Sequence, residues 1–276
     1  MRRREFIALL GGAATWPLPA DAQRPPSPVI GFLSTVAREG FSDRLRGFHD
    51  GLRQIGYVEG DNVAVEFRWA ENQHERLPEL AADLVRRQVS VIVASGGTAG
   101  ALTAKALNTT IPIVFGIPED PVQLGLVDSL SRPGGYMTGV NFFVGELLAK
   151  RLELLRELLP AAKRVAVFVN PENTARARLQ VGQVEAAART MGMQTRIFET
   201  GTTQAVNAAF EMIADERPDA LFVSADPFFP TRRVQLANLA ARHAIPSSFS
   251  VREIVDAGGL MSYGPNIIDA YRLMGL

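Results

Sequence analysis

The sequence predicts an α/β protein made of two successive units, each a parallel β-sheet covered by helices on both faces. Short apolar runs alternate along the chain with segments of helical length, and the whole alternation restarts after residue 143. Most of the short runs are apolar throughout, which is typical of strands buried on both faces of a parallel sheet. Parallel strands need helical crossovers between them, and the spacing of the runs leaves room for these helices.

The first unit is expected to begin with a strand and to alternate strands with helices. The strands cover residues 28–33, 62–69, 89–94 and 111–115, and the helices cover residues 45–55, 77–85 and 98–107. The second of these strands alternates between apolar and polar positions, as a half-buried strand does. Leu45, Phe48 and Leu52 recur instead at the three-to-four-residue spacing of a helix.

The second unit begins with a helical stripe that ends at Pro160. Strands are expected at residues 165–169, 194–198 and 220–223, and helices at residues 148–159, 181–191, 206–214 and 234–243. We expect the division between the units near residues 138–143. Each unit is too small for a large catalytic barrel and has the size of one lobe of a pair.

The N-terminus has the features of an export signal. Three arginines follow the first residue, residues 6–18 are mainly apolar, and Ala20 and Ala22 occupy the two positions that a signal peptidase reads. We therefore expect residues 1–22 to be a signal peptide. The apolar stretch is shorter than the roughly 20 residues that cross a bilayer, but a membrane anchor or a buried helix stays an alternative. The pair Arg3-Arg4 also fits a twin-arginine signal, and the general secretory route stays open.

Composition excludes several classes of function. The chain carries 29 basic and 29 acidic residues, and removal of residues 1–22, with three arginines and two acidic residues, leaves a net charge of about −1. A nucleic-acid-binding protein would be more basic. The chain has no cysteine and its three histidines lie far apart, so no thiolate or histidine metal site is expected. It also has no G-x-S-x-G elbow and no G-x-x-x-x-G-K-[ST] loop, and we expect no catalytic residue, metal or cofactor.

Polar residues and glycines gather where the predicted strands end, and ligands of parallel α/β sheets bind at those ends. The candidates are Ser34, Thr35, Ser95, Gly97, Thr98, Asp120, Asn170 and Asp226. Asp226 is the candidate for meeting a cationic group of the ligand. The neighbouring Phe228 and Phe229 either pack against an apolar part of the ligand or belong to the core.

The turn from Ser95 to Gly100 opens a helix and is the most informative of these sites. Its glycines permit close approach of the backbone, and the free N–H groups of a helix N-terminus attract an anion such as a ligand carboxylate. A dinucleotide-binding loop does not fit, because Ser95 stands where G-x-G-x-x-G requires its first glycine. A plain helix cap, with Ser95 or Thr98 bonded to the backbone, stays an equal alternative.

Three stretches of sequence carry a family resemblance. They are Asp120-Pro121-Val122 with Gly125-Leu126-Val127, then Arg132-Pro133-Gly134-Gly135-Tyr136-Met137-Thr138-Gly139-Val140, and finally Gly258-Gly259-Leu260-Met261-Ser262-Tyr263-Gly264. In these motifs the chain resembles the ABC transporter substrate-binding family, whose members include tryptophan-binding lipoproteins of Gram-positive bacteria. The resemblance covers essentially the whole mature chain. It implies a fold like type I periplasmic-binding proteins: two Rossmann-like lobes with parallel sheets, joined by crossing segments, with the ligand in the cleft between them.

The resemblance also implies how the chain divides. Lobe one comprises residues 23–140 and is completed by residues 258–276, and lobe two comprises residues 141–257. Crossings are expected at residues 140–143 and 258–264, which brings Tyr263 to the cleft as a further ligand-binding candidate. Members usually continue for some tens of residues beyond this point. Because this chain stops at Leu276, we expect it to be truncated and its closed form to be less stable.

The function implied by the resemblance is the capture of a small polar solute, with an amino acid, aromatic in particular, as the first expectation. The partners would be this solute and the permease subunits of an ABC transporter in the inner membrane, and we expect a monomer. Gram-positive relatives are anchored through a cysteine after the signal, and the absence of cysteine here favours the periplasm of a Gram-negative cell. A sensing module for a membrane kinase stays open as the role, and a sugar or an aromatic acid as the ligand.

Overall fold

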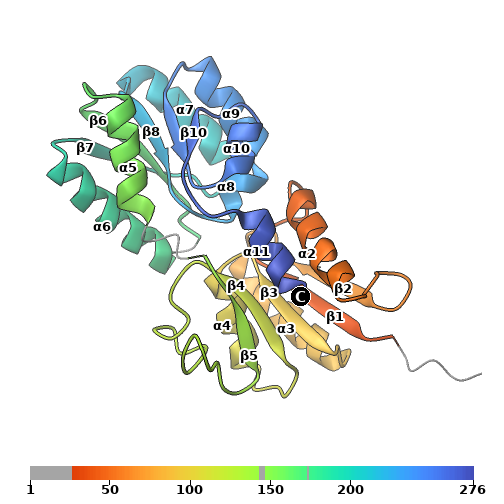
Figure 1. The fold of residues 1–276 in the computed structure, drawn as a ribbon. Helices are drawn as coiled ribbons and strands as arrows, with labels where there is room; N and C mark the ends of the chain where they lie inside the picture. Colours follow the sequence, from red (N-terminus) through yellow and green to blue (C-terminus); the bar gives the residue numbers. More distant parts are fainter. Residues whose placement is uncertain (1–26, 143–146, 173) are drawn as a thin grey trace, which may run out of the picture.

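Two parallel five-stranded sheets form the framework of the protein (Figure 1). The computed structural model describes residues 27–142, 147–172 and 174–276. The expected signal peptide, residues 1–22, lies outside this part of the chain. The two sheets belong to two lobes, as the restart of the strand–helix pattern predicts.

The sheet of lobe one has the strand order β2-β1-β3-β4-β5. Its strands are β1 (Val29–Ser34), β2 (Ala64–Trp69), β3 (Val91–Ser95), β4 (Ile113–Ile117) and β5 (Met137–Asn141). Its helices are α2 (Ser42–Gln54), α3 (Leu77–Arg86) and α4 (Thr98–Ala106), with a 3-10 turn, η2 (His74–Arg76), before α3. Phe32 and Leu33 are both fully buried but belong to different hydrophobic clusters, because successive strand residues point to opposite faces.

The sheet of lobe two has the order β10-β9-β8-β6-β7. Its strands are β6 (Arg164–Val169), β7 (Gln194–Glu199), β8 (Ala220–Val223), β9 (Ser247–Phe249) and β10 (Met261–Ser262). Its helices are α5 (Leu147–Leu158), α6 (Thr174–Thr190), α7 (Thr203–Glu216), α8 (Phe228–Thr231), α9 (Arg233–Arg242) and α10 (Arg252–Asp256). Thr202 caps α7 by accepting a 3.1 Å hydrogen bond from the Ala205 N–H. Phe228 and Phe229 are buried in the core.

The chain returns from lobe two to lobe one later than the sequence predicts. Residues 258–276 are expected to complete lobe one, but β10 pairs with β9 and extends the second sheet. The helix α11 (Ile267–Met274) then packs against α2 of lobe one. The return therefore lies between Tyr263 and Asn266. A strand of two residues is too short for its periodicity to be recognised in the sequence. The expected first crossing, residues 140–143, overlaps the end of β5, and Phe143 lies outside the described residues.

Two glycines let α11 lie close to α2. A Cβ atom at Gly51 would lie 2.0 Å from the carbonyl oxygen of Arg272, and one at Gly47 would lie 2.5 Å from that of Ile268. Only glycine permits this approach of the two backbones. The apolar face of α11 is thereby buried, with Tyr271 only 2% exposed, and this packing fixes the position of Tyr271 at the cleft described below.

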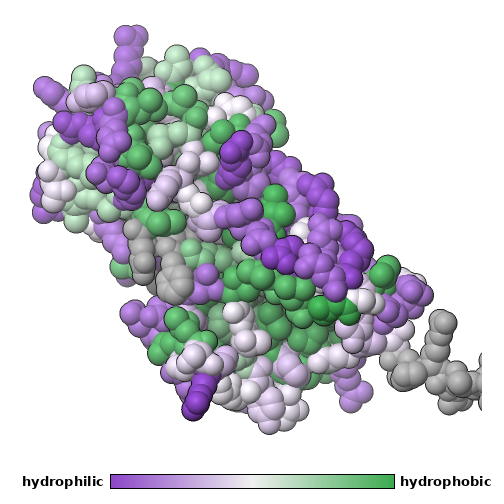
Figure 2. Space-filling view, viewed as in Figure 1, coloured by the Kyte–Doolittle hydropathy of each residue, from purple (hydrophilic) through white to green (hydrophobic). Residues whose placement is uncertain are grey.

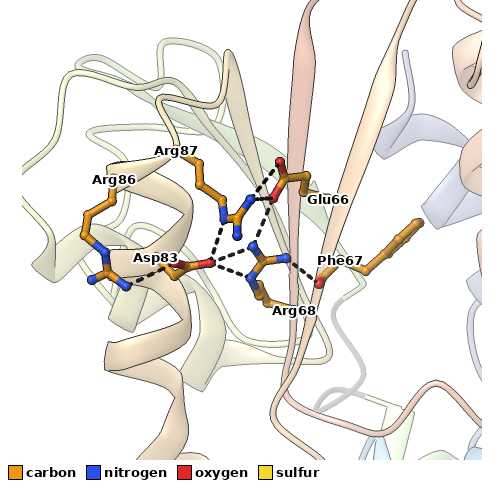
Figure 3. Close-up of polar contacts among 6 residues, drawn as sticks. All are labelled: Glu66, Phe67, Arg68, Asp83, Arg86 and Arg87. Atoms are coloured by element: carbon orange, nitrogen blue, oxygen red, sulfur yellow. Dashed lines mark hydrogen bonds and ion pairs between the residues drawn. The ribbon is translucent and has the colours of Figure 1, made fainter.

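A network of charged side chains ties β2 to α3 on the outer edge of lobe one (Figure 3). Arg68 donates to Asp83 through Nε (2.8 Å) and Nη2 (2.6 Å) and to Glu66 through Nη2 (2.9 Å). Arg87 donates to Asp83 as well, at 3.0 Å. The hydrogen bonds from Arg68 lower the pKa of Asp83 to about 2.

An apolar groove lies beside α11, on the face of the first sheet against which α2 and α11 pack. It is lined by side chains that include Ile30, Val91, Val93, Val114 and Met274, and Figure 2 shows hydrophobic surface on the lower lobe in this region.

No helix in the described residues is both long and apolar enough to cross a membrane.

Candidate ligand-binding cleft

A pocket lies between the two lobes, at the carboxyl ends of their central strands. Lobe one contributes Arg44 from α2 and Gly96 and Gly97 from the turn after β3, and lobe two contributes Arg176 from α6 and Asp226 from the loop after β8. Both sheets direct their strand ends here, which is where α/β folds bind ligands.

The remaining walls of the pocket are mainly apolar. They include Pro118, Phe142, Pro227, Pro230, Val251, Pro265 and Ile267. A few charged groups among apolar walls are typical of pockets that bind small molecules. The pocket therefore suits a ligand with an apolar body and a charged end.

Asp226 is the carboxylate of lobe two in this pocket. It is 8% exposed, and its Oδ1 accepts hydrogen bonds from the Asn170 side chain (2.9 Å) and from the Phe228 N–H (3.0 Å). Among the described residues, both of its hydrogen bonds go to Oδ1, and none of the ion pairs involves Asp226. The oxygen Oδ2 is thus left for a ligand.

Arg44 and Tyr271 stand on the opposite wall. The Arg44 guanidinium lies over the rings of Phe41 (5.3 Å) and Tyr271 (5.8 Å), and its Nε is 3.5 Å from Glu253 of lobe two. Burial raises the pKa of Tyr271, and the adjacent Arg44, Ser95 and Gly96 act against that shift. The Tyr271 hydroxyl therefore stays a neutral hydrogen-bonding group near neutral pH.

Gly96 and Gly97 form the wall between these groups. Gly97 has φ +114° and ψ −175°, a conformation that is essentially restricted to glycine. A Cβ atom there would lie 3.4 Å from Pro227 Cγ, so the two lobes meet at this point. The N-terminus of α4 consequently faces lobe two across a short distance.

Ser34, Thr35 and Ser95 lie beneath this glycine wall and do not line the pocket. All three are at most 2% exposed, and a Cβ atom at Gly96 would lie 2.5 Å from Thr35 Oγ1 and 3.2 Å from Ser34 Oγ. Thr35 donates to the Gly96 carbonyl. The hydroxyl of Ser34 has no hydrogen-bond partner among the described residues, and that of Ser95 faces Tyr271.

Two of the predicted site residues make other contacts. Thr98 donates its hydroxyl to Glu119, and its side chain makes no capping bond at the start of α4. Asp120 accepts hydrogen bonds from the N–H groups of Val122 (2.8 Å) and Gln123 (3.3 Å) and so shapes the loop after β4. Neither side chain lines the pocket.

Asn170 and Tyr263 lie at the margin of the site. Asn170 is 3% exposed and donates to both Asp226 and Asn72 Oδ1 (3.1 Å), so it orients the carboxylate from behind. Tyr263 is 41% exposed and does not line the pocket. Its N–H donates to the Phe249 carbonyl (3.2 Å), which places it at the end of β10.

Three residues of the cleft region are not predicted from the sequence: Arg44, Asn72 and Arg176. Arg44 and Arg176 lie within helices, where no strand-end rule points to them. Asn72 follows β2, and its φ of +65° is a left-handed conformation that asparagine tolerates. No group of three or more His, Cys, Asp or Glu side chains in the described residues could hold a metal ion.

The family of the chain follows from comparison with known proteins. A profile of the family described as ABC transporter substrate binding protein matches residues 29–272. The chain belongs to this family. The match confirms the resemblance seen in the sequence motifs, and this ABC transporter substrate-binding protein is not an enzyme, like the other members of its family.

Its relatives agree with this assignment. A tyrosine-binding protein of Clostridioides difficile (strain R20291) is 28% identical over 235 residues, which are 85% of this chain and 67% of the relative. The ABC domain from Streptococcus pneumonia in complex with L-Trp has a TM-score of 0.73 at 23% identity, over 90% of this chain and 82% of that one. A conserved domain protein from Vibrio cholerae has a TM-score of 0.75 at 23% identity, with the same coverage. The solved structures confirm the fold of type I periplasmic-binding proteins.

Proposed function

We propose that this substrate-binding protein captures an amino acid with an apolar, aromatic side chain and delivers it to an ABC permease in the inner membrane. The observation that carries the proposal is the arrangement of Asp226 and Arg44 on opposite walls of one largely apolar pocket. A zwitterion with a hydrophobic side chain complements the carboxylate of Asp226, the guanidinium of Arg44 and the apolar walls of this pocket.

The ammonium group is assigned to Asp226. Both arginines of the pocket already face a carboxylate of the opposite lobe, Arg44 with Glu253 and Arg176 with Glu119. Asp226 has no such partner among the described residues, so a ligand cation would compensate a buried negative charge. An aromatic acid without an ammonium would add a second negative charge, and a sugar would leave Asp226 uncompensated.

The ligand carboxylate is assigned to lobe one. The N–H groups after Gly96 at the start of α4, the Arg44 guanidinium and the Tyr271 hydroxyl gather on this wall, and helix N-termini attract anions. This assignment keeps the turn that the sequence analysis proposed but replaces the Thr98 hydroxyl, which is bonded to Glu119.

The apolar walls receive the side chain. Phe142 and the prolines of the pocket offer flat hydrophobic surfaces, on which an aromatic ring packs well. The relatives support this choice, since one is named a tyrosine-binding protein and another was solved with L-Trp.

Calorimetric titration with a charge series tests the proposal. L-tryptophan should bind, whereas tryptamine and indole-3-propionate, which each lack one charge, should bind at least about 30-fold more weakly. Equal binding of indole-3-propionate would remove the ammonium assignment. Failure of both L-tryptophan and L-tyrosine to bind, together with a different solute found by mass spectrometry of the purified protein, would reject the ligand class.

Family membership supports the proposed delivery to a permease, and export to the periplasm is proposed with it. A deletion strain should take up the ligand more slowly, and the mature protein should begin at Gln23 in the periplasmic fraction. Normal uptake with a lost transcriptional response to the ligand would instead indicate the sensing role.

A further inference from the structure

A chain of polar contacts runs across the cleft beside the pocket. Thr98 of lobe one donates to Glu119 Oε2, and Arg176 of lobe two donates through Nη1 to Glu119 Oε1. The same Arg176 donates through Nε to the carbonyl of Ala225 at 2.8 Å. The start of α4 is thereby linked to the backbone next to Asp226.

The arginine of this chain is largely removed from water. The side chain of Arg176 is 8% exposed and that of Glu119 is 25% exposed. A charge so buried is costly without a partner, and among the described residues Glu119 is the only carboxylate that pairs with Arg176. Since the two residues belong to different lobes, the arginine has its partner only when the lobes are together.

Other ion pairs between the lobes lack a direct hydrogen bond, although Arg233 of lobe two also donates to the Gly40 carbonyl of lobe one at 2.8 Å. Arg44 and Glu253 are 3.5 Å apart, as are Arg233 and Asp43, and neither ion pair is also a hydrogen bond. Asn72 joins lobe two through neutral hydrogen bonds of 3.1 Å. The pair Glu119–Arg176 combines ionic attraction with a direct hydrogen bond, which makes it the stronger kind of contact.

We propose that Arg176 and Glu119 are positioning residues that couple closure of the cleft to the orientation of Asp226. Arg176 fixes the Ala225 carbonyl and with it the loop that presents Asp226, and it adopts this role fully when Glu119 approaches from lobe one. Closure around a ligand therefore completes the contacts that hold Asp226 in place. The link to ligand binding rests on the proposed function, whereas the link to closure does not.

Closure can be measured without any ligand. The chain has no cysteine, so Leu102→Cys on α4 and Leu158→Cys on α5, both at exposed positions, allow spin labels on one helix of each lobe. Double electron–electron resonance then reports the distance between lobes. Glu119→Gln, which keeps the size but removes the charge, should increase the longer-distance population relative to the parent.

Two further variants separate positioning from folding. The exchange of both residues, Glu119→Arg with Arg176→Glu, should restore the short distance. Gln180→Leu removes a second hydrogen bond to the Ala225 carbonyl (2.9 Å) without crossing the cleft, and it should leave the distance unchanged. Melting curves identify any variant that fails to fold. If the exchange variant does not fold, the distance distribution of Glu119→Gln alone tests the proposal.

Binding of L-tryptophan provides the second readout. Glu119→Gln should release it about 10-fold faster, because loss of a buried charge partner acts mainly on dissociation. An unchanged distance distribution in Glu119→Gln would overturn the proposal. Tighter binding in that variant would overturn it too, since Arg176 would then serve the ligand directly. If L-tryptophan binds neither the parent nor any variant, the proposed ligand class is wrong. The measured distances still test whether the Glu119–Arg176 pair controls closure.

Discussion

Both walls of the cleft include a turn at a strand end, but they present different charges to a ligand. Lobe one offers Arg44 from α2 and the N–H groups at the start of α4, whereas lobe two offers the carboxylate of Asp226, since its own cation, Arg176, is paired with Glu119. Each lobe alone therefore complements only half of a zwitterion. A ligand stabilises the closed arrangement to the extent that it binds that arrangement better than the open one, and the division of charges between lobes supplies such a difference.

The largest effect is expected from removing the charge of lobe two. Asp226→Asn keeps the shape and the Oδ1 contacts but takes away the partner of the ammonium. Loss of one member of a desolvated charge pair costs about 2–4 kcal/mol, or roughly 30- to 1000-fold in Kd. Calorimetry measures the loss, and Glu211→Gln, an exposed carboxylate of the same lobe, serves as control. If Asp226→Asn binds the ligand as tightly as the parent, the assignment of the ligand ammonium to Asp226 is wrong.

The glycine wall of lobe one is expected to give the next largest effect. Gly97→Ala places a side chain in a conformation that costs about 1–3 kcal/mol outside glycine, and its Cβ meets Pro227 of the other lobe at 3.4 Å. The melting temperature of the ligand-free protein should fall, and ligand affinity should fall with it.

The control for this glycine lies within α6. A Cβ atom at Gly182 meets nothing within 4 Å, so Gly182→Ala should raise stability by about 0.5–1 kcal/mol through helix propensity. If both alanine variants melt alike, the strain attributed to Gly97 is absent.

A smaller effect tests the cationic wall in detail. Tyr271→Phe keeps the ring under Arg44 and the packing of α11 but removes the hydroxyl. One hydrogen bond to a charged ligand carboxylate is worth about 1.5–3 kcal/mol, so Kd should rise at least roughly 10-fold. Calorimetry with L-tryptophan and with tryptamine sharpens the result, because tryptamine has no carboxylate and should be insensitive to the change. An equal loss for both ligands would place the hydroxyl elsewhere.

The fold could be predicted from the sequence because its strands and helices are long and strongly patterned. The run over residues 220–223 coincides with β8, and the stripe over residues 148–159 differs from α5 by one residue at each end. The failures are short elements and the start of α6, whose first seven residues lie outside the expected helix at residues 181–191. The strand β9 has three residues and β10 has two, too few for a period to appear. The expected first crossing, residues 140–143, overlaps only the last two residues of β5.

The cleft was predictable only in part, for a related reason. The strand-end rule found Asp226 and Gly97, which line the pocket. It also selected Ser34 and Thr35, which stand at strand ends but are covered by Gly96. Arg44 comes from a helix, and its place at the pocket depends on how that helix packs against α11, so no local pattern reveals it. Contacts that depend on tertiary packing cannot be predicted from motifs or residue spacing.

The smallest effect is expected from charges outside the cleft, which should act on stability alone. The hydrogen bonds from Arg68 and Arg87 lower the pKa of Asp83 from 3.8 to about 2 in the folded protein. A carboxyl with a lowered pKa stabilises the fold above its unfolded pKa and loses that contribution as the pH falls through the folded value. The melting temperature of Asp83→Asn should therefore lie slightly below that of the parent at pH 7, and the difference should vanish between about pH 4 and pH 2. Thermal melts across this range measure the effect, with L-tryptophan affinity at pH 7 as the control that should not change. Because the Asp83 side chain is 28% exposed, salt should also weaken the difference. If Asp83→Asn changes the affinity for L-tryptophan, charges on the outer edge of lobe one act on binding as well as on stability.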